Sequence, residues 1–389
     1  MKPTDFQDSP AGTLVPTISG QQAFVPNPLP PDIDYPRIIG PFSRAMQAIG
    51  ELNGLAHQLE NPLIVIRPLQ RQEALSSSAM EGTFTTANAL ALAEADADQY
   101  VDEATKEVRN YVRAFDEARR MLNEIPLSNR LIKATHQTLL SGLTTNRGAN
   151  KQPGEFKTHQ NFIGGAARRI EDARFVPPPP NETEIAMASL ERYLNRPEDN
   201  GIPPLIDAAL MHYQFETIHP FADGNGRVGR ILIPIYLIQT GVLLQPLLYF
   251  SPAVEGRKSD YVDMMLDVSR YGRWTAWIVF FLDAISNACQ RSAETIERLL
   301  RLRAEFRQKI ADSGGSARYA IIADRLFASP VISAPEAAAL LQVSYPAAQN
   351  AISKLEKLGI LTGLDYTSHP KRFISTSVLD ITDPPGGQN

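Results

Sequence analysis

The sequence predicts a mainly α-helical protein. Apolar residues recur at helical spacing between positions 37 and 121, and again in most later segments up to position 327. Stretches typical of strands are few and short. The segment 146–180 is punctuated by Gly, Asn, Gln and Pro, which indicates a loop with a short hairpin between helices.

The first part of the chain divides into an arm and a helical region. Residues 1–35 are rich in Pro, Gly and Ser, with four prolines between positions 26 and 31, so we expect an extended N-terminal arm lying on a larger body. Residues 36–125 follow as an N-terminal helical region, interrupted at Pro62, Pro68 and Gly82.

Residues 126–312 are predicted to form the core of the protein. Helical patterns there cover 128–140, 182–194, 204–217, 231–240, 260–268 and 274–311. No internal repeat is present in the sequence.

The tail, residues 316–378, has an order of its own. A helical run at 317–327 precedes Ser333, which is a good N-cap for a helix at 335–341. A short turn leads to a third helix at 347–358, and 360–364 and 372–376 are candidate strands. Helix, helix-turn-helix and hairpin is the order of a winged helix.

Composition narrows the class of protein. The chain has 389 residues, 43% of them hydrophobic, and a net charge of −5, so no global basic field would recruit nucleic acid. Cys289 is the only cysteine, which suits a reducing compartment. The N-terminus lacks the apolar run of a signal peptide, and the apolar runs at 231–238 and 277–282 are too short to span a membrane. We expect a soluble cytoplasmic protein with no membrane partner.

The most informative segment runs from His219 to Arg230, with the sequence HPFADGNGRVGR. A glycine-rich turn ahead of an apolar, helix-like run predicts an anion site, because unpaired N–H groups and the helix dipole both favour negative charge. Its two arginines suit phosphate oxygens, its single carboxylate suits Mg²⁺, and its histidine can accept a proton near neutral pH. Together these residues indicate a site for phosphate transfer. The chain has no P-loop sequence.

The same segment resembles the signature of Fic-domain proteins, H-x-F-x-[DE]-G-N-G-R-x-x-R, at every fixed position. The segment 154–164 is similar to the family's flap, 175–180 to the stretch after it, and Ser77–Gly82 to its inhibitory motif [ST]-x-x-x-E-[GN]. The resemblance covers about residues 30–300. It implies a Fic-type helical domain with a short β-hairpin flap, acting as an adenylyltransferase that moves AMP from ATP to a Tyr, Ser or Thr hydroxyl of a target protein.

The resemblance also assigns roles, each of which has a plainer alternative. His219 would be the general base and Asp223 the Mg²⁺ ligand, where an isolated histidine or aspartate would be a helix cap or a solvated loop residue. The phosphates would be held by Gly224, Asn225, Gly226, Arg227 and Arg230. Taken alone, Asn-Gly is an ordinary turn and each arginine a surface ion-pair residue.

Regulation is expected from Glu81. The resemblance implies that Glu81, steadied by Ser77, pairs with Arg230 and keeps the γ-phosphate from seating productively. The alternative is that Ser78 to Glu81 form a capping box for a helix that starts near Ala79.

Two further assignments are weaker in the sequence. The flap, with Phe156, Gln160 and Phe162, would receive the target segment by strand addition, or else be a surface loop. Tyr261 would lie near the adenine, with a place in the core as an equal alternative.

Other functions remain open at this stage. A DNA-binding regulator with a nucleotide-sensing Fic domain is one, and a hydrolase in which Glu81 aligns water to remove AMP is another. Residues 316–389 carry six basic and six acidic side chains, so DNA binding by the tail is not favoured. A homodimer is compatible with the sequence.

Overall fold

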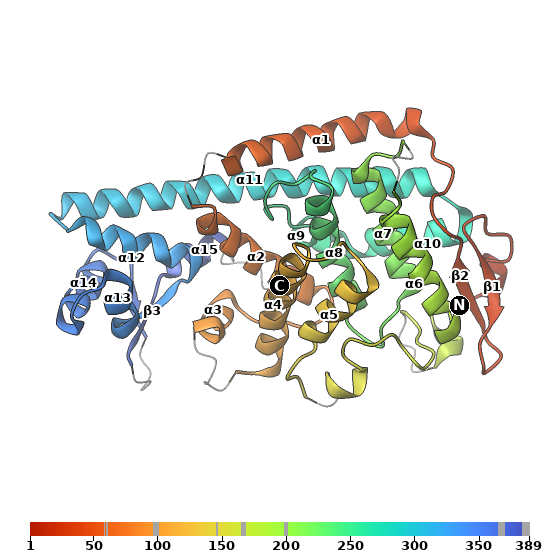
Figure 1. Cartoon of the computed structure of the whole chain (residues 1–389), viewed down its shortest axis with the longest axis horizontal. Coiled ribbons are helices and arrows are strands. Elements are labelled where there is room, and N and C mark those ends of the chain that lie inside the picture. The colour runs from red at the N-terminus through yellow and green to blue at the C-terminus, as the bar shows by residue number, and fades with distance from the viewer. Residues whose placement is uncertain are drawn as a thin grey trace.

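The computed structural model describes residues 1–57, 59, 61–95, 101–144, 147–164, 169–197, 201–364 and 370–382. The fold is mainly helical, as predicted. Its longest element is the 39-residue helix α11 (Trp274–Asp312), which runs along the molecule with α1 (Tyr35–His57) beside it (Figure 1). The remaining helices of the core lie on one side of this pair.

The N-terminal arm contains regular structure that the sequence pattern did not predict. After η1 (Pro3–Asp5), strands β1 (Gly12–Pro16) and β2 (Gln22–Pro26) form an antiparallel hairpin. The arm is held to the body by aromatic packing, because the rings of Phe6, Phe24 and Phe175 lie within 6.0 Å of one another, centroid to centroid. The Phe24 N–H also donates to the Val176 carbonyl at 2.9 Å.

The helical body follows the predicted order. Between the two long helices the chain forms α2 (Leu63–Ala79), α3 (Ala87–Ala95), α4 (Glu103–Met121), α5 (Asn129–Leu139), η2 (Ala149–Lys151), η3 (Ile170–Asp172), α6 (Pro180–Leu194), α7 (Pro204–Ile218), α8 (Asn225–Gln239), α9 (Ser251–Val254), η4 (Glu255–Arg257) and α10 (Lys258–Tyr271). Helices α7 and α8 are buried along almost their whole length and pack against each other. Because α8 begins at Asn225, six residues before its predicted start at Ile231, the glycine-rich turn is continuous with the helix.

The predicted flap hairpin is reduced to a single pairing. Ile163 and Phe175 form an isolated antiparallel bridge, and the residues before Ile163 are irregular. Residues 146 and 165–168 of the predicted loop lie outside the described ranges.

The C-terminal module, residues 316–382, contains the predicted elements and two more. It consists of α12 (Ala317–Ala328), β3 (Val331–Ser333), α13 (Ala334–Leu341), α14 (Tyr345–Lys357), β4 (Thr362–Gly363), β5 (Arg372–Ile374) and α15 (Thr376–Thr382). Its strands form an antiparallel sheet in the order β3-β5-β4. Ser333 caps α13 through a capping box with Glu336, as its position before that helix predicted. That the module is a winged helix stays a prediction, and residues 365–369 of it are not described.

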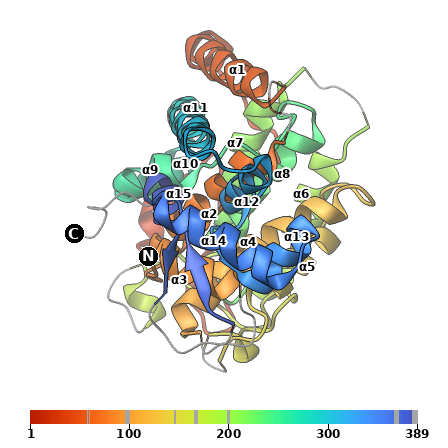
Figure 2. The same ribbon diagram turned by 90° about the vertical axis from the view of Figure 1, so that its left-hand side faces the viewer.

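The C-terminal module packs directly on α2 and α3, as Figure 2 shows. Arg71 of α2 is the polar centre of this contact: its Nε lies 2.6 Å from Glu94 Oε2 on α3, and its Nη2 donates to the Ala328 carbonyl of α12 at 2.6 Å. Leu75, one turn further along α2, packs against an apolar cluster that includes Val331, Ile374 and Leu379. Helix α2 therefore joins the core of the body to the C-terminal module.

Within the described ranges, no helix is both long enough and apolar enough to cross a membrane.

Candidate active site

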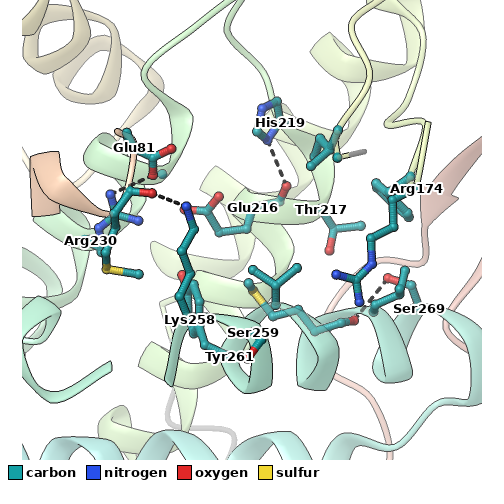
Figure 3. Close-up of a pocket in the computed structure, with 18 residues that line it drawn as sticks. Glu81, Arg174, Glu216, Thr217, His219, Arg230, Lys258, Ser259, Tyr261 and Ser269 are labelled. Carbon is teal, nitrogen blue, oxygen red and sulfur yellow. Dashed lines mark hydrogen bonds and ion pairs between the residues drawn. The ribbon is translucent and has the colours of Figure 1, made fainter. Parts of the chain in front are cut away.

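A cavity of about 560 Å³ opens where the end of α7, the start of α8 and α10 meet the turn after α2 (Figure 3). Its lining includes Glu81, Glu216, His219, Arg230 and Lys258. Five of the site residues predicted from the sequence line it: Glu81, His219, Gly226, Arg230 and Tyr261.

The backbone of the predicted motif is shaped by its own side chains. Helix α7 ends at Ile218, and His219 follows in the left-handed conformation with φ = 49°. Asn225 is buried, and its side chain bonds the backbone of Phe221 twice: Oδ1 accepts from the N–H at 2.8 Å, and Nδ2 donates to the carbonyl at 2.9 Å. Asn225 thus closes the loop ahead of α8, which is a shaping role and not a direct contact with the cavity.

The His219 imidazole is held as a neutral base. Its Nδ1 lies 3.3 Å from the Glu216 carbonyl oxygen, which can only accept, so Nδ1 carries the proton and Nε2 keeps a free lone pair. Burial, reinforced by the Lys157 charge, lowers the pKa of His219 to about 4 against the opposing effects of the Glu216 carbonyl and Glu81. At neutral pH the ring is therefore unprotonated.

Arg230 is bound by the segment that ends α2. Its Nε donates to Ser77 Oγ at 2.8 Å, and its Nη2 donates to the Ser77 carbonyl at 2.9 Å and to Glu81 Oε1 at 2.8 Å. Burial alone would raise the pKa of Glu81, but the charge and hydrogen bond of Arg230 outweigh it and hold that pKa below its ordinary value. Because α2 ends at Ala79, the alternative of a helix that starts there is wrong.

Gly226 leaves the space that Glu81 occupies. A Cβ at position 226 would stand 2.3 Å from Glu81 Oε1 and 2.9 Å from Arg230 Nη1. A side chain at this position would have to displace the Glu81 carboxylate, so a glycine here lets the first turn of α8 lie against the ion pair.

Arg227 is directed away from this cavity. Its Nη1 lies 3.0 Å from Glu107 Oε2 of α4, both side chains are buried, and its Nη2 lies 3.6 Å from Asp223 Oδ1. Glu107 also pairs with Arg147 at 2.5 Å and accepts from Thr83 Oγ1 at 2.8 Å. This acidic partner of the first motif arginine was missed, since nothing in the local sequence around position 107 marks it.

Tyr261 has features of both predicted positions, one in the core and one in the nucleotide site. It is 3% exposed, and its hydroxyl lies 2.5 Å from His212 Nε2 in an aromatic cluster with Trp277, as a core residue would. It also lines the cavity.

The three flap residues have different surroundings. Phe156 turns inward, with its ring 5.5 Å from Phe221 and the Lys133 ammonium 4.6 Å above it. Gln160 Nε2 donates to the Pro177 carbonyl at 2.9 Å, which ties the flap to the segment after it. Phe162 is exposed. Of the three, Phe162 alone is exposed, and the other two are partly buried.

Two buried groups near the motif had no signal in the sequence pattern. His136 on α5 accepts from the Gly154 N–H at 2.9 Å, and its Nε2 lies 3.0 Å from the Asp223 carbonyl, so it joins the flap to the motif loop. Burial lowers the pKa of His136 to about 4 and keeps it neutral. Lys157 of the flap is buried beside the end of α7.

Glu216 is a further residue that the sequence analysis did not anticipate. It lies one turn before His219, and its Oε1 is buried with no hydrogen-bond partner in the described part of the chain. Burial raises its pKa to about 8. The nearby Arg230 charge lowers this pKa, whereas the Glu81 charge raises it further. The cavity therefore holds a second carboxyl that favours its neutral form.

The residues present fit Mg²⁺ only as a partner of phosphates. The described ranges contain no cluster of three or more His, Cys, Asp or Glu side chains suited to a metal. Asp223 has a side chain that is 43% exposed at the mouth of the motif loop, where its Oδ1 accepts from the Gly224 N–H at 2.6 Å. A single carboxylate with open coordination space is what Mg²⁺ uses when substrate phosphates and water supply its other ligands.

Comparison with known families gives matches to two parts of the helical body. Residues 40–120 match the Fic/DOC family N-terminal domain, and residues 126–237 match the Fic/DOC family domain. The Protein adenylyltransferase Fic of Drosophila melanogaster is 29% identical over 203 residues, which are 51% of this chain and 37% of that protein. That of Drosophila mojavensis is 39% identical over 88 residues, 23% of this chain and 16% of that protein. The match thus covers little more than a third of the length of the first of these curated relatives and about a sixth of the second.

Solved structures share the fold. A Fic family protein from Desulfovibrio desulfuricans G20 superposes with a TM-score of 0.56 at 20% identity, over 89% of this chain and 98% of that one. A Fic domain containing signaling protein from Bacteroides thetaiotaomicron gives 0.52 at 22% identity, over 65% and 97%.

Proposed function

The chain belongs to the Fic/DOC family, and on that premise we propose that it is an autoinhibited protein adenylyltransferase that transfers AMP from ATP to a hydroxyl side chain of a target protein. The observation that carries the proposal is that a neutral histidine and a carboxylate-bound arginine line one cavity at the start of α8. The curated relatives named Protein adenylyltransferase Fic support the same reaction.

His219 serves as the general base. Its free Nε2 lone pair accepts the proton from a Tyr, Ser or Thr hydroxyl, so that the hydroxyl oxygen attacks the α-phosphate and pyrophosphate leaves. The lowered pKa supports this role because the ring is unprotonated at neutral pH. General-base assistance of this kind contributes roughly 10²–10⁴-fold to the rate.

The start of α8 holds the phosphates. Gly224 at φ = 77° and Gly226 expose the N-terminal N–H groups of α8, where the helix dipole favours negative charge. Arg230 supplies fixed positive charge for the γ-phosphate once it is released from Glu81. Arg227, which the resemblance assigned to the phosphates, reaches a phosphate only by rearranging its contact with Glu107.

Asp223 is the residue that would hold Mg²⁺, together with the phosphates of ATP. The metal would neutralise phosphate charge and favour departure of pyrophosphate. Its exposed carboxylate and the lack of a crowded acidic cluster around it suit a cation that arrives together with ATP.

Glu81 is the inhibitory residue. It binds the Arg230 guanidinium, which the γ-phosphate needs. Its Oε1 also fills the space beside Gly226 at the anion-binding end of α8. ATP that enters while this pair is intact meets a carboxylate where its own negative charge would bind, so the triphosphate cannot align for attack.

The test is incubation of Glu81→Gly with labelled ATP and Mg²⁺, followed by detection of label on the protein itself and on proteins of a lysate. Transfer of the α-phosphate label, with no transfer from γ-labelled ATP, is expected. Transfer of the γ label would instead indicate a kinase reaction and reject adenylylation.

A further inference from the structure

A buried ammonium lies beneath the flap. Lys157 is 3% exposed, although nothing in its sequence context distinguishes it from a surface lysine. Its Nζ donates to Asn161 Oδ1 at 2.8 Å, to the Ile218 carbonyl at 3.2 Å and to the His219 carbonyl at 3.0 Å. All three acceptors are neutral, and burial is the cause that lowers the pKa of Lys157 to about 7.

Burial of this charge is unfavourable unless the groups that it contacts stabilise it. An ammonium taken out of water without a carboxylate partner carries a large desolvation penalty. The carbonyls of Ile218 and His219 form the C-terminal end of α7, where the partial negative charge of the helix offsets part of that penalty. Two of the three acceptors are therefore backbone carbonyls at the end of α7, and one of these belongs to His219 itself.

The flap also fixes the backbone of residues 219–221 by three other hydrogen bonds. The Lys157 N–H donates to the Pro220 carbonyl at 2.8 Å. Asn161 Nδ2 donates to the carbonyls of His219 and Phe221, both at 3.0 Å. His219 itself has φ = 49°, a conformation that a residue with a side chain adopts at a cost, so the surrounding contacts must hold it there.

We propose that Lys157 is a positioning residue for His219: its hydrogen bonds hold the His219 backbone in the left-handed conformation, and its buried positive charge disfavours a second positive charge on the imidazole. The inference rests on the proposed role of His219 as the general base. Lys157 touches the backbone of the base, while the imidazole is the group that meets the target hydroxyl.

The charged groups around His219 agree with this role. Glu81, Glu216, Arg230, Lys258 and Arg174 line the cavity that the imidazole faces. After burial, the Lys157 charge is the largest influence on the pKa of His219, and it acts in the opposite direction to Glu81. The pKa of Lys157 is about 7 and that of His219 is about 4. Between these two pH values the lysine is therefore mostly protonated and the imidazole mostly unprotonated.

Three substitutions separate the charge from the hydrogen bonds. Lys157→Arg keeps both, Lys157→Gln keeps a donor without the charge, and Lys157→Met removes both. Each is made in the Glu81→Gly background, and His219 is followed by NMR titration of isotope-labelled histidine, its signal assigned by its loss in His219→Ala. Self-labelling with ATP is measured over the same pH range.

The expected result is a rise in the His219 pKa of about one unit in the Gln and Met variants, as loss of a nearby like charge produces. Arg should leave the titration close to that of the parent. Labelling should slow by about 10-fold or more in Met at pH 6, because a misplaced base loses its alignment. The pH at which labelling reaches half of its maximal rate should be higher in Lys157→Gln than in the Glu81→Gly parent.

A purely structural lysine would lower the melting temperature without moving the His219 titration or the pH profile, and that result overturns the proposal. If Met does not fold, Gln and Arg decide the question by the titration alone. Failure of the Glu81→Gly parent to label would reject the proposed function, whereas the NMR titration would still show whether Lys157 controls His219.

Discussion

Arg230 and Glu81 are joined by a hydrogen-bonded ion pair of 2.8 Å across 149 residues of sequence. The guanidinium is almost fully buried, with 2% of its side chain exposed, while the Glu81 side chain is 37% exposed. The pair is therefore asymmetric: the arginine is fixed among Ser77 contacts, and the carboxylate has access to solvent. Removal of Glu81 leaves Arg230 in place for another anion.

Glu81→Gly is expected to raise self-labelling by roughly 10-fold or more, the change that about 1.4 kcal/mol of lost restraint gives. The freed Arg230 can then bind the γ-phosphate. The measurement is the initial rate of incorporation of α-labelled ATP. Equal rates in variant and wild type would mean that the pair is only structural.

Two matched variants identify the cause of that gain. Glu81→Gln keeps the side-chain volume and helix propensity but removes the charge, so it should also exceed wild type if ion pairing is the restraint. A fully inhibited Gln variant would point to steric obstruction. Arg230→Ala breaks the same pair but removes the phosphate contact, so it should stay slow with or without Glu81.

His219→Ala should abolish transfer and leave ATP binding measurable, because the start of α8 and Arg230 remain. Isothermal titration with ATP and Mg²⁺, made in the Glu81→Gly background, gives the affinity alongside the labelling rate. Labelling at the parent rate would show that another group accepts the proton.

Glu216→Gln should stabilise the protein at alkaline pH and not at acidic pH. Glu216 keeps its proton up to about pH 8 in the folded state, whereas its ordinary pKa is 4.5. The stability that this raised pKa gives is complete below pH 4.5 and is lost as the pH rises through 8. Glutamine resembles the protonated acid and does not titrate.

The melting temperature of Glu216→Gln relative to wild type should thus be constant below pH 4.5 and climb towards pH 9. A gain of about 2 °C or more corresponds to about 1 kcal/mol in a large domain. A difference that does not vary with pH would show that Glu216 ionises normally in the fold.

Arg71→Met should destabilise the protein by about 1–3 kcal/mol, because it leaves Glu94 and the Ala328 carbonyl without their donor. Urea unfolding measures the change. The double variant Arg71→Met/Glu94→Gln should recover part of the loss. If the effects of Arg71→Met and Glu94→Gln on the free energy of unfolding simply add, the ion pair contributes nothing to the contact between α2 and the C-terminal module.

The full chain is expected to bind duplex DNA only weakly at moderate salt. Lys354 of α14, the third predicted helix of the tail, donates to the Ser313 carbonyl at 3.3 Å, so this cation is engaged with the end of α11. A salt-resistant, sequence-selective complex in a mobility-shift assay would favour the DNA-binding alternative instead.

The helices and the motif could be predicted because their information is local. Helical periodicity placed most elements within a few residues, and the residues from His219 to Arg230 are contiguous in the chain. The start of α8 was predicted too late because a glycine-rich turn and a helix N-terminus use the same residues. Short strands such as β1 and β3 were missed because their pairing is set by tertiary packing.

The partners of the motif could not be predicted from spacing. Glu107 meets Arg227 across 120 residues, and Lys157 meets His219 across 62. Burial of a lysine or a glutamate depends on which elements cover it, and a single sequence carries no local trace of that. The pairing of Glu81 with Arg230 was expected only through resemblance to a family.

Helix α2 is buried on several sides, by α4, α8 and α9 in the body and by α12 and α15 in the C-terminal module. A helix clamped in this way cannot swing out as a rigid rod without opening both cores. Glu81, by contrast, stands beyond the helix end, on a short turn closed by Gly82 at φ = 80°. Release of Arg230 therefore requires only a small local excursion of that turn and of one side chain, so the inhibited and released states share nearly all of their native contacts and the barrier between them is separate from the barrier to unfolding.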